Sequence, residues 1–362
     1  MKLLVLPVSG GGFVVQLAAL QLLSGIKFIP DVTLGSSGGN VAAYVGAAAN
    51  WRWAGIERIA RGLSHHMFVQ DWSIFRALAF GIGYFKGELY NHGSGVEEFL
   101  KLHFAQDTIQ YYELWTGTYN WDRQRAQMFT NRAAGRTLLD PTIIDVELAQ
   151  CMDPVYTQGD FKIIAKAAMA SASIPALVPA QEIFGEHHVD GGISSASPLT
   201  VMKEPILDVI SKTGQPLHLI YINSDNLDSP VDRSINTALD RSKQAVSALI
   251  RSHGVIDRQI GYDLIRYHQP TATIHKDQFP LTLENITRLL EIWDQVQSSM
   301  LEIYPENEVE VDITSFSGQD VLDKISEVSG GCHCRLWWVT SEPIKTASVK
   351  ELIASCKSVS SG

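Results

Sequence analysis

Two stretches within the first fifty residues each combine an apolar strand pattern, a glycine-rich turn and an apolar helix pattern. In the first stretch, residues 3–8 predict a buried strand and residues 13–23 predict a helix. In the second, residues 31–34 predict a short strand and the alanine-rich residues 40–49 predict a helix. Parallel strands need such helical crossovers, so two successive units predict a parallel sheet wrapped by helices, which is the α/β class.

The predicted sheet continues well beyond these two units. Residues 217–222 predict a buried strand, while residues 161–165 and Val189 are strand candidates on either side of a loop that contains prolines. Residues 51–135 are rich in Trp, Tyr and Phe but lack strand alternation. We therefore expect a core over residues 1–225 with an insertion of helices and long loops at about 51–135 that could cover a site.

The part of the chain from 226 to 362 is expected to add helices and late strands to the same domain. No Gly/Ser-rich linker separates it from the preceding residues, which favours one elaborated domain. The predicted elements are helices at 232–268, 283–304 and 319–328 and strands at 271–275, 309–313 and 335–340.

Composition and charge exclude several classes of protein. A formal net charge of -10 would repel nucleic acid phosphates, so no nucleic acid partner is expected. Four cysteines are too few for a disulfide scaffold and favour a reducing compartment, for which we expect the cytoplasm. The apolar run after Lys2 is too short for a signal peptide, and we expect no transmembrane helix. Cys332 and Cys334 lack the spacing of a structural zinc site, so no metal is expected.

The segment from Gly35 to Gly39 matches the pattern G-x-S-x-G and lies between the second predicted strand and its helix. Glycines allow a sharp turn that presents the central serine, and the start of the helix offers backbone amides and the positive end of the helix dipole. Ser37 is therefore the candidate nucleophile. The alternative is a plain strand–helix connection, because short glycine-rich turns match this pattern by chance.

A glycine triplet, Gly10 to Gly12, follows the first predicted strand and precedes the first helix. In a parallel sheet its amides would face the same crevice as Ser37, at the carboxyl ends of the strands. Such amides could bind the oxyanion that forms when an ester carbonyl is attacked. A nucleotide-binding turn is the alternative, but its G-x-G-x-x-G motif needs a third glycine where Val15 stands.

Two further blocks lie downstream: an A-S-x-x-I-P segment at residues 170–175 and an Asp-Gly-Gly turn that begins at Asp190. The order and spacing of the glycine triplet, G-x-S-x-G and these two blocks resemble the patatin-like phospholipases over roughly residues 3–200. The resemblance implies a three-layer α/β/α patatin-like fold, with a mostly parallel central sheet and a helical C-terminal elaboration.

The same resemblance implies hydrolysis of phospholipids or related acyl esters. A membrane surface is one place where the protein could meet such a substrate, as a cytoplasmic protein that associates peripherally with membranes. Ser37 would attack the carbonyl and Asp190 would accept its proton, without a metal or a cofactor. The oxyanion hole would consist of the amides of Gly10, Gly11, Gly12 and Gly38.

Departures from the family pattern leave alternatives open. Val14 and Val15 stand where the family usually has an arginine and a glycine, so a catalytically weak lipid-binding protein is one alternative. A carboxylesterase or acyltransferase of the same fold is another. A Ser-His-Asp triad is a third alternative, because histidines lie beside Asp190 and after it in the chain, at His187, His188, His218, His253, His268 and His275.

Overall fold

The structure is a computed structural model. It describes residues 1–9, 13–25, 28–62, 69–70, 91–92, 111–140, 152–175, 178–195, 197–214, 217–222, 248–249, 252–257, 259–260, 264, 273–280, 300–305 and 333–340.

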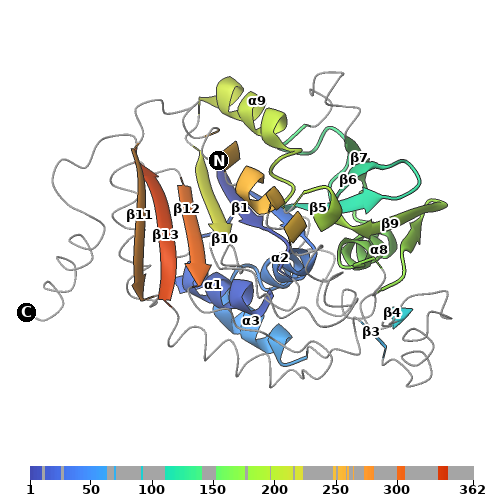
Figure 1. The fold of residues 1–362 in the computed structure, drawn as a ribbon, viewed down its shortest axis with the longest axis horizontal. Helices are drawn as coiled ribbons and strands as arrows, with labels where there is room; N and C mark the ends of the chain where they lie inside the picture. The colour runs from blue at the N-terminus through green and yellow to red at the C-terminus, as the bar shows by residue number, and fades with distance from the viewer. Residues whose placement is uncertain are drawn as a thin grey trace, which may run out of the picture.

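The centre of the fold is a parallel sheet, as predicted from the two strand–turn–helix units (Figure 1). Five neighbouring strands run parallel in the order β12 (Met300–Pro305), β10 (His218–Ile222), β1 (Lys2–Leu6), β2 (Val32–Ser36) and β5 (Glu113–Asn120). The loops after β1 and β2 therefore leave the sheet on the same side, at the carboxyl ends of the strands, where ligand sites of open α/β sheets lie.

Antiparallel strands extend this sheet on both sides. Beyond β12 lie β13 (His333–Thr340) and β11 (Thr273–Pro280), so three strands of the C-terminal part join the same sheet. Beyond β5 lie β6 (Arg125–Thr130) and β7 (Met152–Tyr156), and β7 is parallel to β6. The remaining strands are the hairpin of β8 (Gln181–Ile183) and β9 (Glu186–Asp190), attached to β5 through β9, and the separate pair β3 (Val69–Gln70) and β4 (Asn91–His92).

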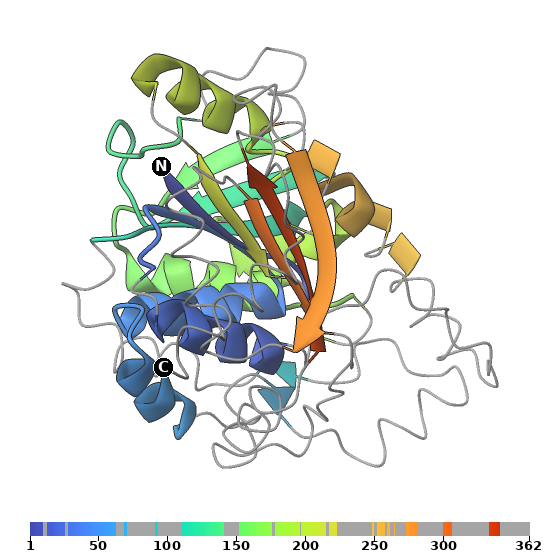
Figure 2. The ribbon, with the colours of Figure 1, turned by 90° about the vertical axis from the view of Figure 1, so that its left-hand side faces the viewer.

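Helices cover both faces of the sheet, which confirms the predicted three-layer α/β/α architecture (Figures 1 and 2). One face carries α9 (Lys203–Thr213). The other face carries four helices, α1 (Phe13–Gly25), α2 (Gly38–Ala48), α3 (Trp53–Ala60) and α8 (Phe161–Ser171).

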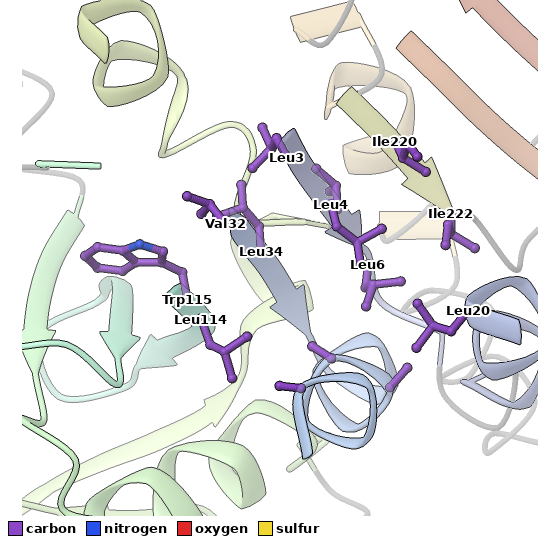
Figure 3. Close-up of a cluster of buried hydrophobic side chains, with 14 of the residues drawn as sticks. Leu3, Leu4, Leu6, Leu20, Val32, Leu34, Leu114, Trp115, Ile220 and Ile222 are labelled. Carbon is purple, nitrogen blue, oxygen red and sulfur yellow. The ribbon is translucent and has the colours of Figure 1, made fainter. Parts of the chain in front are cut away.

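The core explains why two helical layers are needed. Successive side chains of a strand point to opposite faces, and all four residues from Leu3 to Leu6 are fully buried. Strand β2 is likewise buried along its whole length. Figure 3 shows these side chains packed with those of the neighbouring strands and of Leu20 in α1. Full burial of each leucine contributes about 1.5–3 kcal/mol, which only cover on both faces can provide.

Three local predictions are wrong. Residues 161–165 lie in helix α8, which begins where the Asp160 carboxylate accepts hydrogen bonds from the amides of Lys162 and Ile163. Residues 113–130, predicted as part of an insertion of helices and loops, include β5 and β6 of the central sheet. Strand β5 lacks alternation in sequence because it is buried on both faces. Residues 300–304, predicted as the end of a helix, lie in β12.

Other predicted features lie outside the described residues. They are the glycine triplet 10–12, the strand at 309–313, the helix at 319–328, and most of the aromatic stretch between residues 51 and 111.

Candidate active site

The G-x-S-x-G segment forms a sharp strand–turn–helix corner. Strand β2 ends at Ser36, helix α2 begins at Gly38, and Ser37 between them has φ 52° and ψ -131°. A non-glycine residue in such a conformation costs about 1–3 kcal/mol and persists only where its surroundings hold it. The corner therefore presents the Ser37 side chain at the carboxyl end of β2 with a strained backbone, as expected of a nucleophile elbow.

Close packing explains the glycine at position 39 of this corner. A Cβ atom on Gly39 would lie 2.2 Å from the carbonyl oxygen of Leu6 and 2.3 Å from that of Pro7. The start of α2 thus touches the backbone at the end of β1. This contact brings the turn after β2 against the residues that directly follow β1.

Asp190 lies next to Ser37 because of the strand register around β5. Ser36, the last residue of β2, pairs with Gly117 of β5. Asp190, the last residue of β9, pairs with the following residue, Thr118. Strands β2 and β9 both pair with the side of β5 that faces away from β6. Because β2 runs parallel and β9 antiparallel to β5, their carboxyl ends meet.

The two side chains are hydrogen-bonded at this meeting point. Ser37 Oγ donates to Asp190 Oδ2 at 2.7 Å, and the amide of Gly192 donates to Asp190 Oδ1 at 2.8 Å. Ser37 is 2% and Asp190 4% exposed, so the pair is shielded from bulk water. A hydroxyl held against a buried carboxylate has the geometry in which the carboxylate can take up its proton.

Burial raises the pKa of the Asp190 carboxyl to about 7, although the hydrogen bonds from Gly192 and Ser37 act in the opposite direction. Desolvation disfavours the charged form, and here it outweighs the two donors. A base that titrates near neutral pH combines a useful population of the ionised form with a strong affinity for protons.

The two histidines beside Asp190 bind groups other than Ser37. His187 is exposed, and its Nδ1 lies 3.0 Å from the Asp122 carboxylate. His188 is buried, and its ring nitrogens face the carbonyl oxygen of Glu186 and the amide of Gln127.

Of the histidines that follow Asp190 in the chain, His253 is one whose side chain the structure describes. Its Nδ1 is 3.3 Å from the carbonyl oxygen of Gly192. In the part of the chain that the structure describes, the side-chain partner of the Ser37 hydroxyl is Asp190. His268 lies outside this part, and the side chains of His218 and His275 are not among those described.

Of the four residues predicted to form the oxyanion hole, the structure describes Gly38. Gly38 is the first residue of α2, and the first amides of a helix have no acceptor within it, so they are free to face a ligand. Gly10, Gly11 and Gly12 lie outside the described residues. The backbone just before them is held by Gln16, whose buried amide nitrogen donates to the carbonyl oxygens of Pro7 and Ile222.

A second buried carboxylate, Asp257, was not predicted from the sequence. It accepts hydrogen bonds from the amide of Ser197 at 2.6 Å and from the hydroxyl of Thr200, and it lies within 3.4 Å of the Ser195 hydroxyl. Burial raises its pKa to about 7 as well. Asp257 therefore anchors the segment that follows the Asp-Gly-Gly turn. An isolated aspartate in a region predicted as an amphipathic helix carries no local signal of this contact.

Within the described residues, no helix combines the length and apolar character that a bilayer crossing requires, and no three side chains of the metal-binding types gather in one place.

Comparison with known proteins identifies the family. A family model described as patatin-like phospholipase matches residues 6–203, which is more than half of the chain. A search of curated proteins finds no match. The matched region contains Ser37, Asp190 and the strands that bring them together. The chain therefore belongs to the patatin-like phospholipase family, a family of lipid acyl hydrolases.

Proposed function

We propose that this protein hydrolyses phospholipids or related acyl esters through a catalytic dyad of Ser37 and Asp190 and a covalent acyl-enzyme. The observation that carries the proposal is the 2.7 Å hydrogen bond from Ser37 Oγ to a carboxylate that burial has made more basic. Family membership supports the substrate class, because the matched family acts on lipid acyl esters.

In the first half of the reaction, Ser37 Oγ attacks the ester carbonyl carbon while its proton passes to Asp190 Oδ2. The resulting tetrahedral oxyanion is held by the amide of Gly38 and by amides of the glycine triplet 10–12. The carbon–oxygen bond to the alcohol then breaks, and the alcohol leaves with the proton from Asp190. The acyl group remains esterified to Ser37.

In the second half, water takes the place of the alcohol. Asp190 accepts a proton from the water as its oxygen attacks the acyl carbon, and the collapse of the second oxyanion returns the proton to Ser37 Oγ. The products are a fatty acid and the free enzyme. Each step uses only the acyl group, water and one transferable proton, so the proposed cycle requires no cofactor.

Asp190 is suited to this role without a histidine. An exposed aspartate is a weak base at neutral pH, whereas Asp190 holds its proton up to about pH 7. The amide of Gly192 leaves one carboxylate oxygen directed at Ser37. The fixed orientation lowers the cost of bringing base and nucleophile together.

The test is covalent labelling with a fluorophosphonate, followed by mass mapping of the modified peptide. We expect modification at Ser37 in the wild-type protein and none in Ser37→Ala. Ser36→Ala is the matched control, because the Ser36 hydroxyl is equally buried, lies next in the chain and has no hydrogen-bond partner in the described structure. It should label like the wild type. Labelling at another residue, or no labelling at all, would contradict the proposal.

Substrate class is tested by release of fatty acid from phosphatidylcholine vesicles. Addition of an alcohol acceptor distinguishes a hydrolase from an acyltransferase, because a transferase would form a new ester at the expense of free fatty acid. We expect free fatty acid with and without the acceptor.

A further inference from the structure

The strained backbone of Ser37 needs a partner that holds it in place. The φ of 52° places Ser37 in a region that side chains other than glycine rarely adopt. Its amide precedes the first turn of α2, so the helix offers it no acceptor. The surrounding structure must therefore supply one.

The acceptor is the hydroxyl of Ser171, at the end of α8. The amide of Ser37 donates to Ser171 Oγ at 2.9 Å, and the same hydroxyl donates to the carbonyl oxygen of Gly117 at 2.7 Å. Ser171 is fully buried. One hydroxyl thus links the corner after β2 to strand β5, and its proton is directed by the Gly117 carbonyl so that a lone pair faces Ser37.

The residues at the end of α8 also hold the backbone of Asp190. The amide of Asp190 donates to the carbonyl oxygen of Ser173 at 3.0 Å. Ser37 and Asp190 come from segments 153 positions apart in the chain, yet both backbones are bound to the three residues from Ser171 to Ser173. This stretch belongs to the A-S-x-x-I-P block.

We propose that Ser171 is a positioning residue, whose hydroxyl holds the backbone of Ser37 so that Ser37 Oγ stays within reach of Asp190. The inference rests on the proposed function, since it assigns a role in the same reaction. Ser171 contacts the backbone of the nucleophile, not its Oγ, and so takes no part in bond making or proton transfer.

Removal of this hydroxyl should impair the chemistry more than substrate binding. Ser171→Ala removes the hydroxyl that the buried Ser37 amide and the Gly117 carbonyl share as a hydrogen-bond partner, which is unfavourable in the protein interior. The corner then departs from the conformation in which Oγ meets Asp190. A misplacement of about 1 Å can cost about 100-fold in rate, so we expect kcat and the fluorophosphonate labelling rate of Ser37 to fall about 10- to 100-fold, with KM unchanged.

Two further variants separate this role from a general loss of packing. Ser171→Thr retains the hydroxyl and should recover most of the labelling rate. Thr157→Val is the matched control: the buried Thr157 hydroxyl, just after the edge strand β7, donates to the carbonyl oxygen of Thr130 at the end of β6, at 2.9 Å. This variant loses a buried hydroxyl that donates to the end of β6 and not to the corner around Ser37, so it should label at the wild-type rate.

A pH profile adds a signature that a merely structural residue would not produce. The hydroxyl of Ser37 lowers the pKa of Asp190 by donating to it. If Ser171→Ala draws Ser37 away from this position, the acid limb of the labelling rate moves to higher pH, whereas Thr157→Val leaves it in place.

The outcomes distinguish this inference from the proposed function. Wild-type protein that does not label at Ser37 would overturn both. Wild-type labelling together with equal rates and equal pH profiles in Ser171→Ala would overturn the positioning role alone. A lower melting temperature of Ser171→Ala with unchanged labelling in the folded protein would also overturn it.

Discussion

The buried charge of Asp190 should make the protein less stable, and its removal should stabilise the fold while slowing the reaction. The perturbation is Asp190→Asn, which keeps the shape of the side chain. The asparagine oxygen can still accept the hydrogen bond from Gly192, and its amide group can donate to the Ser37 hydroxyl.

The magnitude follows from linkage between proton binding and folding. Asp190 has a pKa of about 7 in the folded protein against an ordinary value of 3.8. Between these values the folded state binds more protons than the unfolded state, so stability falls as pH rises through this window and is constant above it. One pKa unit corresponds to about 1.4 kcal/mol, so the loss reaches about 4 kcal/mol above pH 7.

Asparagine carries no charge, so the stability of the Asp190→Asn protein does not include the loss that comes from ionising Asp190. Relative to the wild type, Asp190→Asn should therefore gain about 2–3 kcal/mol between pH 5 and pH 8. Asp257, whose pKa is also raised to about 7, contributes a similar pH dependence to both proteins and cancels in the difference.

The assay is urea denaturation of both proteins at pH 5 and pH 8, with the free energy of unfolding extrapolated to water. We expect Asp190→Asn to be the more stable protein at pH 8 and the gap to shrink at pH 5. A difference between the two proteins that is the same at both pH values would refute the reasoning, because Asp190 would then titrate at an ordinary pKa.

Three further predictions concern the site. The acylation rate of the wild type should rise about tenfold per pH unit up to about pH 7 and then level off, since only ionised Asp190 accepts the proton; a rate that is flat from pH 5 to pH 8 would contradict a base whose pKa is raised to about 7. Gly39→Ala should yield little folded protein, because its Cβ would lie 2.2 Å from the Leu6 carbonyl oxygen. The control variant Gly135→Ala has nothing within 4 Å of its Cβ and should lose only about 1–2 kcal/mol of stability, because of its positive φ. Similar melting temperatures of the two variants would contradict this prediction. His253→Ala should label at Ser37 at the wild-type rate, because Asp190 and not His253 is the proposed base. Loss of a general base typically slows a reaction by about 10²- to 10⁴-fold, so a loss of that size would favour a Ser-His-Asp triad.

The corner around Ser37 could be predicted from the sequence because its determinants are local. A short apolar strand, flanking glycines and an alanine-rich helix lie within about twenty residues and together specify a strand–turn–helix unit. The Asp190 turn could be predicted because Asp-Gly-Gly follows a strand pattern and completes a set of spaced blocks. In both cases the reactive side chain stands beside glycines that the tight turn after a strand requires, so the turn pattern also locates the side chain.

The contacts that hold these corners together could not be predicted, because they join distant segments. Ser171 contacts Ser37 across 134 positions, and Asp257 contacts Ser197 across 60. A buried serine or aspartate looks in sequence like an exposed one, since burial is decided by tertiary packing. The A-S-x-x-I-P block identified the family but did not reveal which atom its serine holds.

The errors in secondary structure have a related cause. Periodicity distinguishes helices from strands only when one face is exposed. Strand β5 is buried on both faces and shows no alternation. The short apolar run from Phe161 to Ala165 fits a strand or a helix equally well, and the Asp160 cap decides for the helix.

The most direct test of the central claim is the rate at which a phospholipid acylates Ser37 in the wild type and in Asp190→Asn, measured by rapid quenching and mass analysis of the intact protein. With Asp190 as the base, the variant should acylate about 10²- to 10⁴-fold more slowly, although it remains folded. Acylation of Ser37 in Asp190→Asn at the wild-type rate would show that another group activates the nucleophile.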